Sequence, residues 1–177
     1  MNNSKLSYFI NALFIYVLNF VLLSALGVQF IIGDEPCPLC LLQRMGMMLM
    51  IFGLSLNVVN GFKYRNFAFV ILFALLGSSF SIRQILLHIC PTSGTSGYGS
   101  PVFGLHLYTW ALIVYLCGII ASTIFIMSVK KETKRKRKIY KFEKVALYLS
   151  LIIIIINVIA AFNECGFGPC CENGPCP

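Results

Sequence analysis

Two cysteines separated by two residues, Cys37 and Cys40, are the part of this sequence best suited to chemistry, and Arg44 follows four residues later. A C-x-x-C pair forms a readily exchanged disulfide, whose thiolate is stabilised if the second cysteine begins a helix. Pro38, inside the pair, limits backbone freedom and removes one amide donor. Residues spaced i, i+4 share a helix face, so Arg44 is expected on the face of Cys40, about one turn (~6 Å) further along. The spacing predicts thiol redox chemistry beside a fixed positive charge.

The elements that position this pair are long apolar runs. The chain has 177 residues, of which 58% are hydrophobic and 11% charged, whereas a soluble domain carries about 25% charged residues. A helix needs roughly 20 apolar residues to cross a bilayer core. Five stretches meet this length, and we expect an all-α integral membrane protein, a four-helix transmembrane bundle plus an additional C-terminal transmembrane helix. The stretches lie near residues 9–32, 41–60, 67–87, 105–129 and 145–162.

Basic residues predict the orientation of these spans. Nine of the fourteen Lys and Arg residues lie between Lys130 and Lys144, and the loops at 33–40 and 88–104 contain none. Because Lys and Arg concentrate in cytoplasmic loops, the N-terminus is expected in the cytoplasm and the tail from residue 163 outside. The net charge of +8 then reflects a topology anchor near anionic lipid rather than a nucleic-acid site. The first run is longer than the usual apolar region of a signal peptide, so we interpret it as a retained span.

The chain therefore divides into four parts. We expect a four-helix membrane domain at 1–129, a basic cytoplasmic loop at 130–144, a fifth transmembrane helix at 145–162 and an extracytoplasmic, cysteine-rich tail at 163–177.

The cysteines follow the same sidedness. Cys117 alone among the eight lies in mid-span, where a cysteine is usually a small packed hydrophobe. The other seven are all expected on the extracytoplasmic side, an oxidising compartment in which disulfides persist. Seven is odd, so at least one thiol is free, exchanging or paired with another chain. The seven are Cys37, Cys40, Cys90, Cys165, Cys170, Cys171 and Cys176.

Arg44 allows two interpretations. A charge inside the membrane is costly and marks a functional site, where it would hold a thiolate at Cys40 or polarise a carbonyl of a bound electron acceptor. Alternatively, the side chain extends to the interface. Gln43 beside it adds a second polar group and favours the first interpretation. The C-x-x-C pair could also be half of a zinc site, with His88, His106 or the tail as further ligands, although the oxidising side and the adjacent lipid argue against this.

The string from Glu35 to Arg44, EPCPLCLLQR, resembles the disulfide bond formation protein B (DsbB) family, as does the stretch from Gly104 to Trp110. The resemblance spans about residues 5–128. It implies a four-helix bundle in the cell inner membrane, a disulfide-generating thiol:quinone oxidoreductase. Such a protein reoxidises a soluble, periplasmic, thioredoxin-like thiol oxidase (DsbA-like) and passes electrons to ubiquinone or menaquinone. Cys37 and Cys40 match the quinone-coupled pair, and Arg44 matches the quinone-side arginine.

The second outer loop departs from this family. Its members keep a second cysteine pair there, whereas this loop holds only Cys90. The tail offers a substitute, a tandem repeat of Cys165 to Cys170 and Cys171 to Cys176 whose glycines and prolines favour turns. We expect a tail disulfide, or one between Cys90 and the tail, to relay electrons to the first pair by thiol exchange. A structural disulfide knot, a tail that binds copper or zinc, and a dispensable appendage remain alternatives.

Other polar residues near the outer ends of the spans extend the candidate site. Arg83, Gln84 and His88 lie near the end of the third span and are expected either to line a quinone-head pocket or, for Arg83, to extend to the interface. His88 would offer a hydrogen bond or a proton path. His106 is assigned to the aromatic belt of the membrane interface.

Two other functions compete with the oxidoreductase. A vitamin K epoxide reductase-like protein also couples C-x-x-C to quinone, but its pair lies late in the bundle. A metal transporter or metallochaperone would use the tail as ligands, but a transporter needs polar residues through several spans. The mid-span polar residues counted here are few: Ser24, Asn57, Ser78, Ser79, Cys117 and Asn157.

Overall fold

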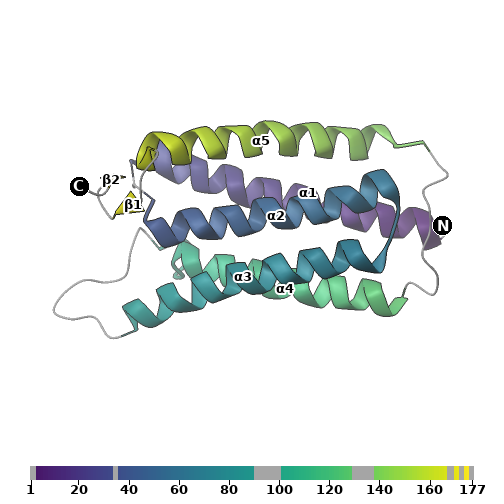
Figure 1. Ribbon diagram of the computed structural model, residues 1–177, viewed down its shortest axis with the longest axis horizontal. Helices are drawn as coiled ribbons and strands as arrows, with labels where there is room; N and C mark the ends of the chain where they lie inside the picture. Colours follow the sequence, from purple (N-terminus) through teal and green to yellow (C-terminus); the bar gives the residue numbers. More distant parts are fainter. Residues whose placement is uncertain are drawn as a thin grey trace.

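Five long helices lie side by side along one axis in the described part of the chain (Figure 1). The computed structural model describes residues 3–33, 36–89, 101–128, 138–166, 170–171 and 174–175. All five helices are long and apolar enough to cross a membrane, which confirms the predicted all-α membrane fold. They are α1 (Asn3–Gly27), α2 (Pro38–Asn60), α3 (Tyr64–His88), α4 (Leu107–Ser128) and α5 (Lys141–Cys165), with a π-helical turn, η1 (Val28–Ile32), directly after α1.

Successive helices run in opposite directions (Figure 1). The end of α1, the start of α2, the end of α3, the start of α4 and the end of α5 therefore meet at one end of the bundle. This end carries Cys37, Cys40, His88 and Cys165. The alternation agrees with the sidedness expected from the basic residues, while the compartment that each end faces remains a prediction.

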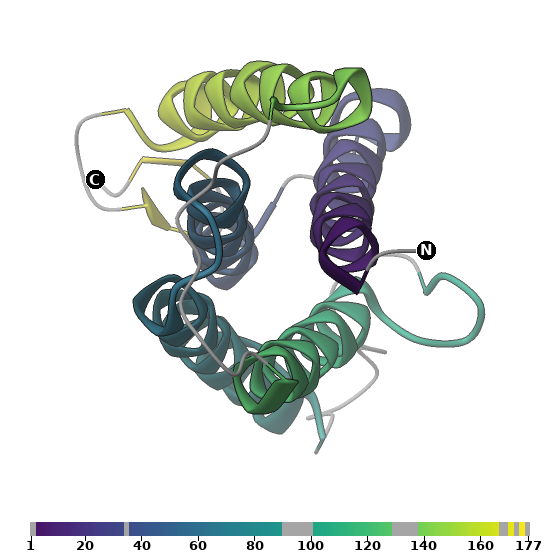
Figure 2. The ribbon, with the colours of Figure 1, turned by 90° about the vertical axis from the view of Figure 1, so that its right-hand side faces the viewer.

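The helices form an open ring when viewed along their axes (Figure 2). The closest packing is of α3 against α2 and α4, while α1 packs against α2 and α5. Within the described residues, α1 and α4 have few close contacts with each other, although both face α2. The fifth helix lies against α1 and α2, and α2 is the helix that begins at the cysteine pair.

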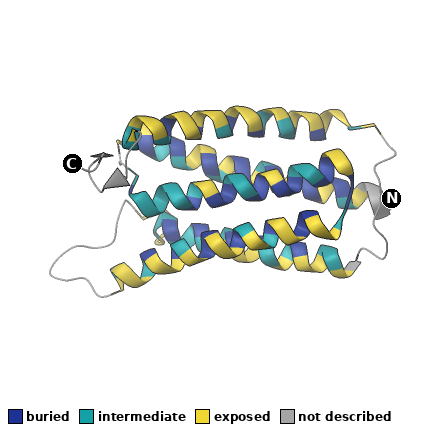
Figure 3. Cartoon of the chain, viewed as in Figure 1, coloured by how far each residue is buried: buried dark blue, intermediate teal, exposed yellow. Residues whose placement is uncertain are grey.

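The outward faces of the helices are apolar. Figure 3 shows exposed residues along the outer side of every long helix, and many of them are large hydrophobic side chains such as Phe20, Leu86 and Ile152. Such a surface is stable only where lipid rather than water surrounds it. The core is formed by smaller sets of buried residues, among them Ile15, Met50, Val70 and Tyr115.

Local sequence explains where α2 and α5 begin. The sulfur of Cys37 accepts a hydrogen bond from the Cys40 amide at 3.2 Å and caps α2, and Pro38 follows at the first helical position, where its missing N–H has no helical partner anyway. At the start of α5, the carboxylate of Glu143 accepts from the Tyr140 amide at 3.0 Å, which forms a capping box. The helix therefore starts at Lys141, four residues earlier than the expected 145, and takes in the end of the basic segment.

Polar side chains inside the bundle are more numerous than the sequence argument counted. The buried face of α5 carries Glu143, Ser150 and Asn157, seven residues apart, and the amide of Asn19 in α1 donates to the Ser150 hydroxyl at 2.8 Å. At the end opposite the cysteine pair, Asn11, Asn57 and Asn66 form a hydrogen-bonded chain across α1, α2 and α3. The expected set of mid-span polar residues therefore missed Asn11, Asn19 and Ser150, whose side chains join one helix to another.

The segment after α5 contains two short strands. Strand β1 (Cys170–Cys171) pairs antiparallel with β2 (Gly174–Pro175), and both contact α5. This hairpin lies at the same end of the bundle as the start of α2 (Figure 1). Most of the basic segment expected at 130–144 lies outside the described residues.

Candidate active site

The cysteine pair lies at the first turn of α2. The two sulfur atoms are 2.7 Å apart and share an S–H···S hydrogen bond, and both cysteines are free thiols. Cys37 is buried and Cys40 half-buried. The hydrogen bond with Cys40 and, secondly, burial raise the pKa of the Cys37 thiol above its ordinary value. The arrangement places two thiols within bonding reach, with Cys37 held in its protonated form.

Gln84 of α3 contacts both sulfur atoms. Its side-chain amide donates to Cys37 at 3.2 Å and to Cys40 at 3.4 Å. Its carbonyl oxygen accepts from the side-chain amide of Gln43 at 2.7 Å. Gln84 is only 1% exposed, so these bonds are protected from water. An amide donor aimed at sulfur favours the thiolate over the thiol, and here it serves both cysteines.

Two contacts fix Gln43 and Gln84 in place. The hydroxyl of Tyr115 in α4 donates to the backbone carbonyl of Gln43, and the Nδ1 atom of His88 lies 2.7 Å from the backbone carbonyl of Gln84. The Tyr115 ring fits because Gly46 and Gly77 have no side chains, and a Cβ atom at either position would overlap it. The close approach of α2, α3 and α4 thus sets the position of both amides.

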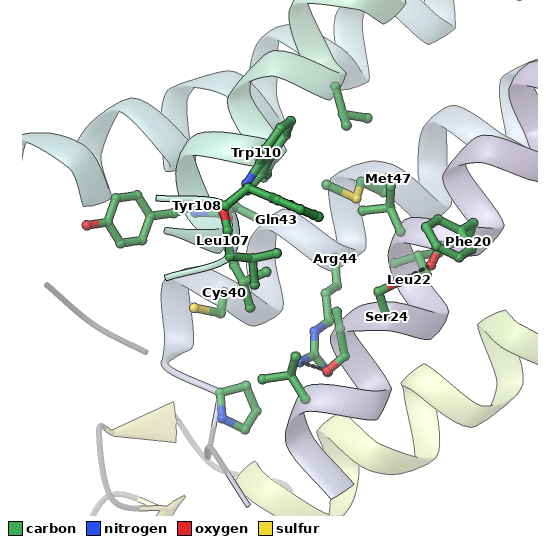
Figure 4. A pocket seen from close by; sticks show the side chains of 18 residues that line it. Phe20, Leu22, Ser24, Cys40, Gln43, Arg44, Met47, Leu107, Tyr108 and Trp110 are labelled. Atoms are coloured by element: carbon green, nitrogen blue, oxygen red, sulfur yellow. Dashed lines mark hydrogen bonds between the residues drawn. The ribbon is translucent and has the colours of Figure 1, made fainter. Parts of the chain in front are cut away.

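Arg44 extends from α2 toward α1 rather than toward the sulfur atoms (Figure 4). Its Nη1 donates to the side-chain carbonyl of Gln29 at 2.6 Å, and its Nη2 donates to the backbone carbonyl of Ala25 at 3.1 Å. The Gln29 amide in turn donates to the carboxylate of Glu164, in the last turn of α5, at 2.8 Å. The Arg44 side chain is therefore held by specific partners near the ends of α1 and α5, and its role toward an electron acceptor stays a prediction.

A cavity of about 310 Å³ lies between α1, α2 and α4, beside the cysteine pair (Figure 4). Cys40, Gln43 and Arg44 form its polar wall, and the rest of its lining is largely apolar, including Phe20, Met47 and Trp110. Phe20 is 70% exposed on the outer, lipid-facing side of α1, so the cavity reaches the surface that contacts the membrane interior. It suits a flat molecule with a polar head and an apolar remainder.

Two residues that were candidates for binding the cofactor, Arg83 and His88, lie outside the cavity lining. Arg83 is exposed on α3, and neither Arg83 nor His88 is among the residues that line the cavity. His88 instead stacks on the ring of Tyr108, with ring centroids 5.5 Å apart, and His106 stacks on the same ring at 5.2 Å. His106, assigned to an aromatic belt, thus does contact an aromatic residue. The structure brings together Cys37, Cys40, Gln43 and Arg44 of the predicted set. The exposed position of Arg83 agrees with the alternative that it extends to the interface, and the cofactor role of His88 stays a prediction.

The predicted tail site is described only in part. Cys165 is disulfide-bonded, and its partner sulfur lies outside the residues whose side chains are described. Cys90 and the side chains of Cys170, Cys171 and Cys176 also lie outside them. Among the side chains that are described, no three His, Cys, Asp or Glu residues come together as a metal-ion site.

Gln29, Glu164 and Tyr115 were not predicted from the sequence as residues of the site. The contact of Gln84 with the two sulfur atoms was not predicted either. Each of the first three is a polar residue at the end of, or within, an apolar span, which is the one signal that could have identified them. The chain has three glutamines, Gln29, Gln43 and Gln84. Gln43 bonds to Gln84, Gln84 bonds to the cysteines, and Gln29 bonds to Arg44.

Comparison with known proteins agrees with this geometry. The family model for "Disulfide bond formation protein DsbB" matches residues 7–98, a shorter range than the expected 5–128. The chain is 30% identical over 101 residues to disulfide bond formation protein B 1 of Pseudomonas fluorescens Pf0-1, which covers 54% of this chain and 45% of that protein. It is 28% identical over 116 residues to the protein of the same name from strain Pf-5, covering 60% of this chain and 54% of the relative. The chain therefore spans about half the length of these curated relatives, and no solved structure matches it significantly.

Proposed function

Because the chain belongs to the disulfide bond formation protein DsbB family, whose model matches residues 7–98, we propose that it is a membrane thiol:quinone oxidoreductase. Membership of the family and the five apolar helices establish a multi-pass membrane protein of disulfide bond formation. We further propose that the electron acceptor is a quinone, that a soluble partner supplies the electrons and that the protein lies in the inner membrane. The single observation that carries these proposals is the cavity wall, where Cys40 lies beside Gln43 and Arg44.

The lining of the cavity fits a quinone. A quinone head is flat and apolar with two carbonyl oxygens, and Arg44 and Gln43 supply hydrogen-bond donors on the α2 side of the cavity. The apolar lining from α1 and α4 suits the ring, and the lipid-facing position of Phe20 leaves a path for a prenyl tail into the membrane. Few polar groups at fixed points within an apolar pocket are typical of cofactor sites.

The chain's own residues provide for the thiol chemistry. When bound, the quinone accepts two electrons and two protons, while Cys37 and Cys40 lose them and join in a disulfide. Gln84 stabilises negative charge on either sulfur through its two hydrogen bonds, and Cys37 keeps its proton until Cys40 reacts because its pKa is raised. Cys40 is the cysteine that lines the cavity, so we assign it to the acceptor side and Cys37 to exchange with incoming thiols.

Electrons would enter from a soluble, DsbA-like thiol oxidase at the end of the bundle that carries the cysteines. Cys90 and the tail cysteines, Cys165, Cys170, Cys171 and Cys176, are proposed to accept them first and to relay them to Cys37. The disulfide at Cys165 and the position of the hairpin at the end of the bundle where α2 starts (Figure 1) support this order, since Cys37 caps α2. Thiol exchange moves electrons through mixed disulfides without any added oxidant.

The test is turnover in detergent with a reduced thioredoxin-like thiol oxidase and a short-chain ubiquinone or menaquinone. Loss of quinone absorbance should require both cysteines of the pair, so C37S and C40S should each abolish it. The matched control is C117S, since Cys117 is an exposed free thiol on α4 outside the cavity lining. Turnover that survives in C40S would refute the proposed function.

A further inference from the structure

The fifth helix reaches the acceptor side of the site, although it lies outside the residues matched by the family model. Its last turn carries Glu164, whose carboxylate accepts a hydrogen bond from the Gln29 amide at 2.8 Å. The same Gln29 side chain accepts from the Arg44 guanidinium at 2.6 Å. One amide therefore connects an acidic residue of α5 to the arginine of the cavity wall.

The order of donors and acceptors in this chain is fixed by chemistry. An ionised carboxylate only accepts hydrogen bonds and a guanidinium only donates them. The amide of Gln29 must then present its NH2 group to Glu164 and its oxygen to Arg44, as observed. Arg44 and Glu164 favour the same orientation, because the flipped amide would aim its N–H groups at the cation and its oxygen at the carboxylate. Glu164 thus reinforces the orientation of Gln29 that binds Arg44 and holds the amide from its other side.

Local structure supports the same role. Gln29 is the buried residue of the π-helical turn η1, while its neighbours Phe30 and Ile31 are exposed. Single π-helical turns occur frequently at functional sites. At 7% exposure, the Gln29 amide is shielded from water, so its two charge-assisted hydrogen bonds are stronger than neutral ones. The electrostatic attraction between Glu164 and Arg44 acts in the same direction.

We propose that Glu164 is a positioning residue for the acceptor site: through Gln29 it fixes the Arg44 guanidinium at the edge of the cavity. This inference rests on the proposed function for the identity of the acceptor. It gives α5 a role in the reaction, because a held guanidinium meets the acceptor's carbonyl oxygen without first losing conformational freedom. A loose guanidinium has to be ordered each time the acceptor binds.

The test needs a variant that leaves α5 docked. E164Q keeps the size of the side chain and removes its charge. The matched control is S150A, which removes the hydrogen bond between Asn19 and Ser150 at another point of the α1–α5 contact and touches neither Gln29 nor Arg44. If the effect of E164Q were only a loosening of α5, S150A would reproduce it.

Two readouts separate this inference from the proposed function. The first uses protein labelled with [15N]glutamine and no quinone; since the chain has three glutamines, three side-chain NH2 signals are expected. E164Q adds a fourth NH2 signal, from position 164 itself. It should shift the signal of Gln29, identified by its loss in Q29N, and leave those of Gln43 and Gln84 in place. The second is the KM for quinone, which should rise about fivefold in E164Q, with kcat changed by less than about twofold.

Each outcome either supports or overturns the positioning role of Glu164. A shifted Gln29 signal together with a raised KM in E164Q, both absent in S150A, supports the positioning role. An unshifted Gln29 signal, an unchanged KM, or equal effects in S150A would overturn it. If the unsubstituted chain reduces no quinone, the proposed function fails, while the NMR comparison still decides whether Glu164 sets the Gln29 amide.

Discussion

The side-chain amide of Gln84 donates to the sulfur of Cys37 across 3.2 Å, from a helix that begins 26 residues after the cysteine helix starts (Tyr64 against Pro38). The same nitrogen lies 3.4 Å from the sulfur of Cys40. A single buried donor therefore serves whichever sulfur carries negative charge. This contact couples the cysteine pair to α3, which contributes no residue to the cavity lining.

Replacing Gln84 by leucine should slow oxidation of the reduced pair by quinone about 10- to 150-fold, because a hydrogen bond to a charged group contributes about 1.5–3 kcal/mol. The measurement is the single-turnover rate after rapid mixing. The control is L86A on the exposed face of the same helix, which should keep the unsubstituted rate. Equal rates in Q84L and the unsubstituted chain would show that the amide does not act on the sulfur atoms.

The reactivity of Cys37 in the reduced protein should depend on pH. Its pKa is raised, first by the hydrogen bond with Cys40 and then by burial, and only the thiolate is alkylated. Alkylation of Cys37, followed peptide by peptide by mass spectrometry, should therefore be slow at neutral pH and still be rising above the ordinary thiol pKa of ~8.5. C40A removes the largest cause and should accelerate it, whereas a plateau near neutral pH would contradict the raised pKa.

The raised pKa of Cys37 also makes the stability of the folded protein depend on pH. The folded, reduced protein holds the Cys37 proton more tightly than the unfolded chain does, since the folded pKa is raised. This contribution to the free energy of unfolding is complete below the ordinary thiol pKa of ~8.5 and declines as the pH rises above it.

Gly77 should tolerate no side chain. A Cβ atom there would overlap the ring of Tyr115, which is fully buried and bonded to the Gln43 carbonyl. Overpacking of this kind costs about 1–3 kcal/mol, so G77A should lower the Tm in detergent and also disturb Gln43. In G118A the added Cβ atom meets only the end of the flexible Met50 side chain, and a much smaller loss is expected. Equal Tm values for both variants would contradict this packing.

The sequence predicted the spans well because apolar length alone decides whether a helix can cross a membrane. It also predicted the pairing of Cys40 with Gln43 and Arg44 at one site, since these residues are neighbours on one helix. It could not predict the contacts of Gln84, Tyr115 or Glu164, because these depend on which helices pack together and in what register. The same dependence on packing left two positions open for Arg83, which is one residue away from Gln84 and faces outward while Gln84 faces inward.

The tail relay requires a sharper test than removal of the whole tail. Deleting residues 163–177 would also remove Glu164, so a lower activity would have two causes. Replacing Cys170, Cys171 and Cys176 by serine keeps Glu164 in the chain and leaves Cys165 without a partner cysteine in the tail. We expect this variant to lose most reoxidation of the soluble partner, measured by the partner's free thiols. Its pre-reduced Cys37–Cys40 pair should still reduce quinone.

A result in which the triple variant reoxidises the partner at the unsubstituted rate would remove the tail from the relay. In that case the disulfide at Cys165 would be a structural element of the outer end of α5. C90S, compared in parallel, shows whether Cys90 is needed together with the tail or in place of it.

The central claim is that the Cys37–Cys40 dithiol passes its electrons to a quinone in the adjoining cavity. The most direct measurement uses a variant with serine at Cys90 and at all four tail cysteines, fully reduced and mixed with excess quinone in the absence of any partner. The account predicts that one quinone is reduced per chain and that mass spectrometry finds a Cys37–Cys40 disulfide. No loss of quinone absorbance, or quinone reduction that leaves both thiols free, would contradict it.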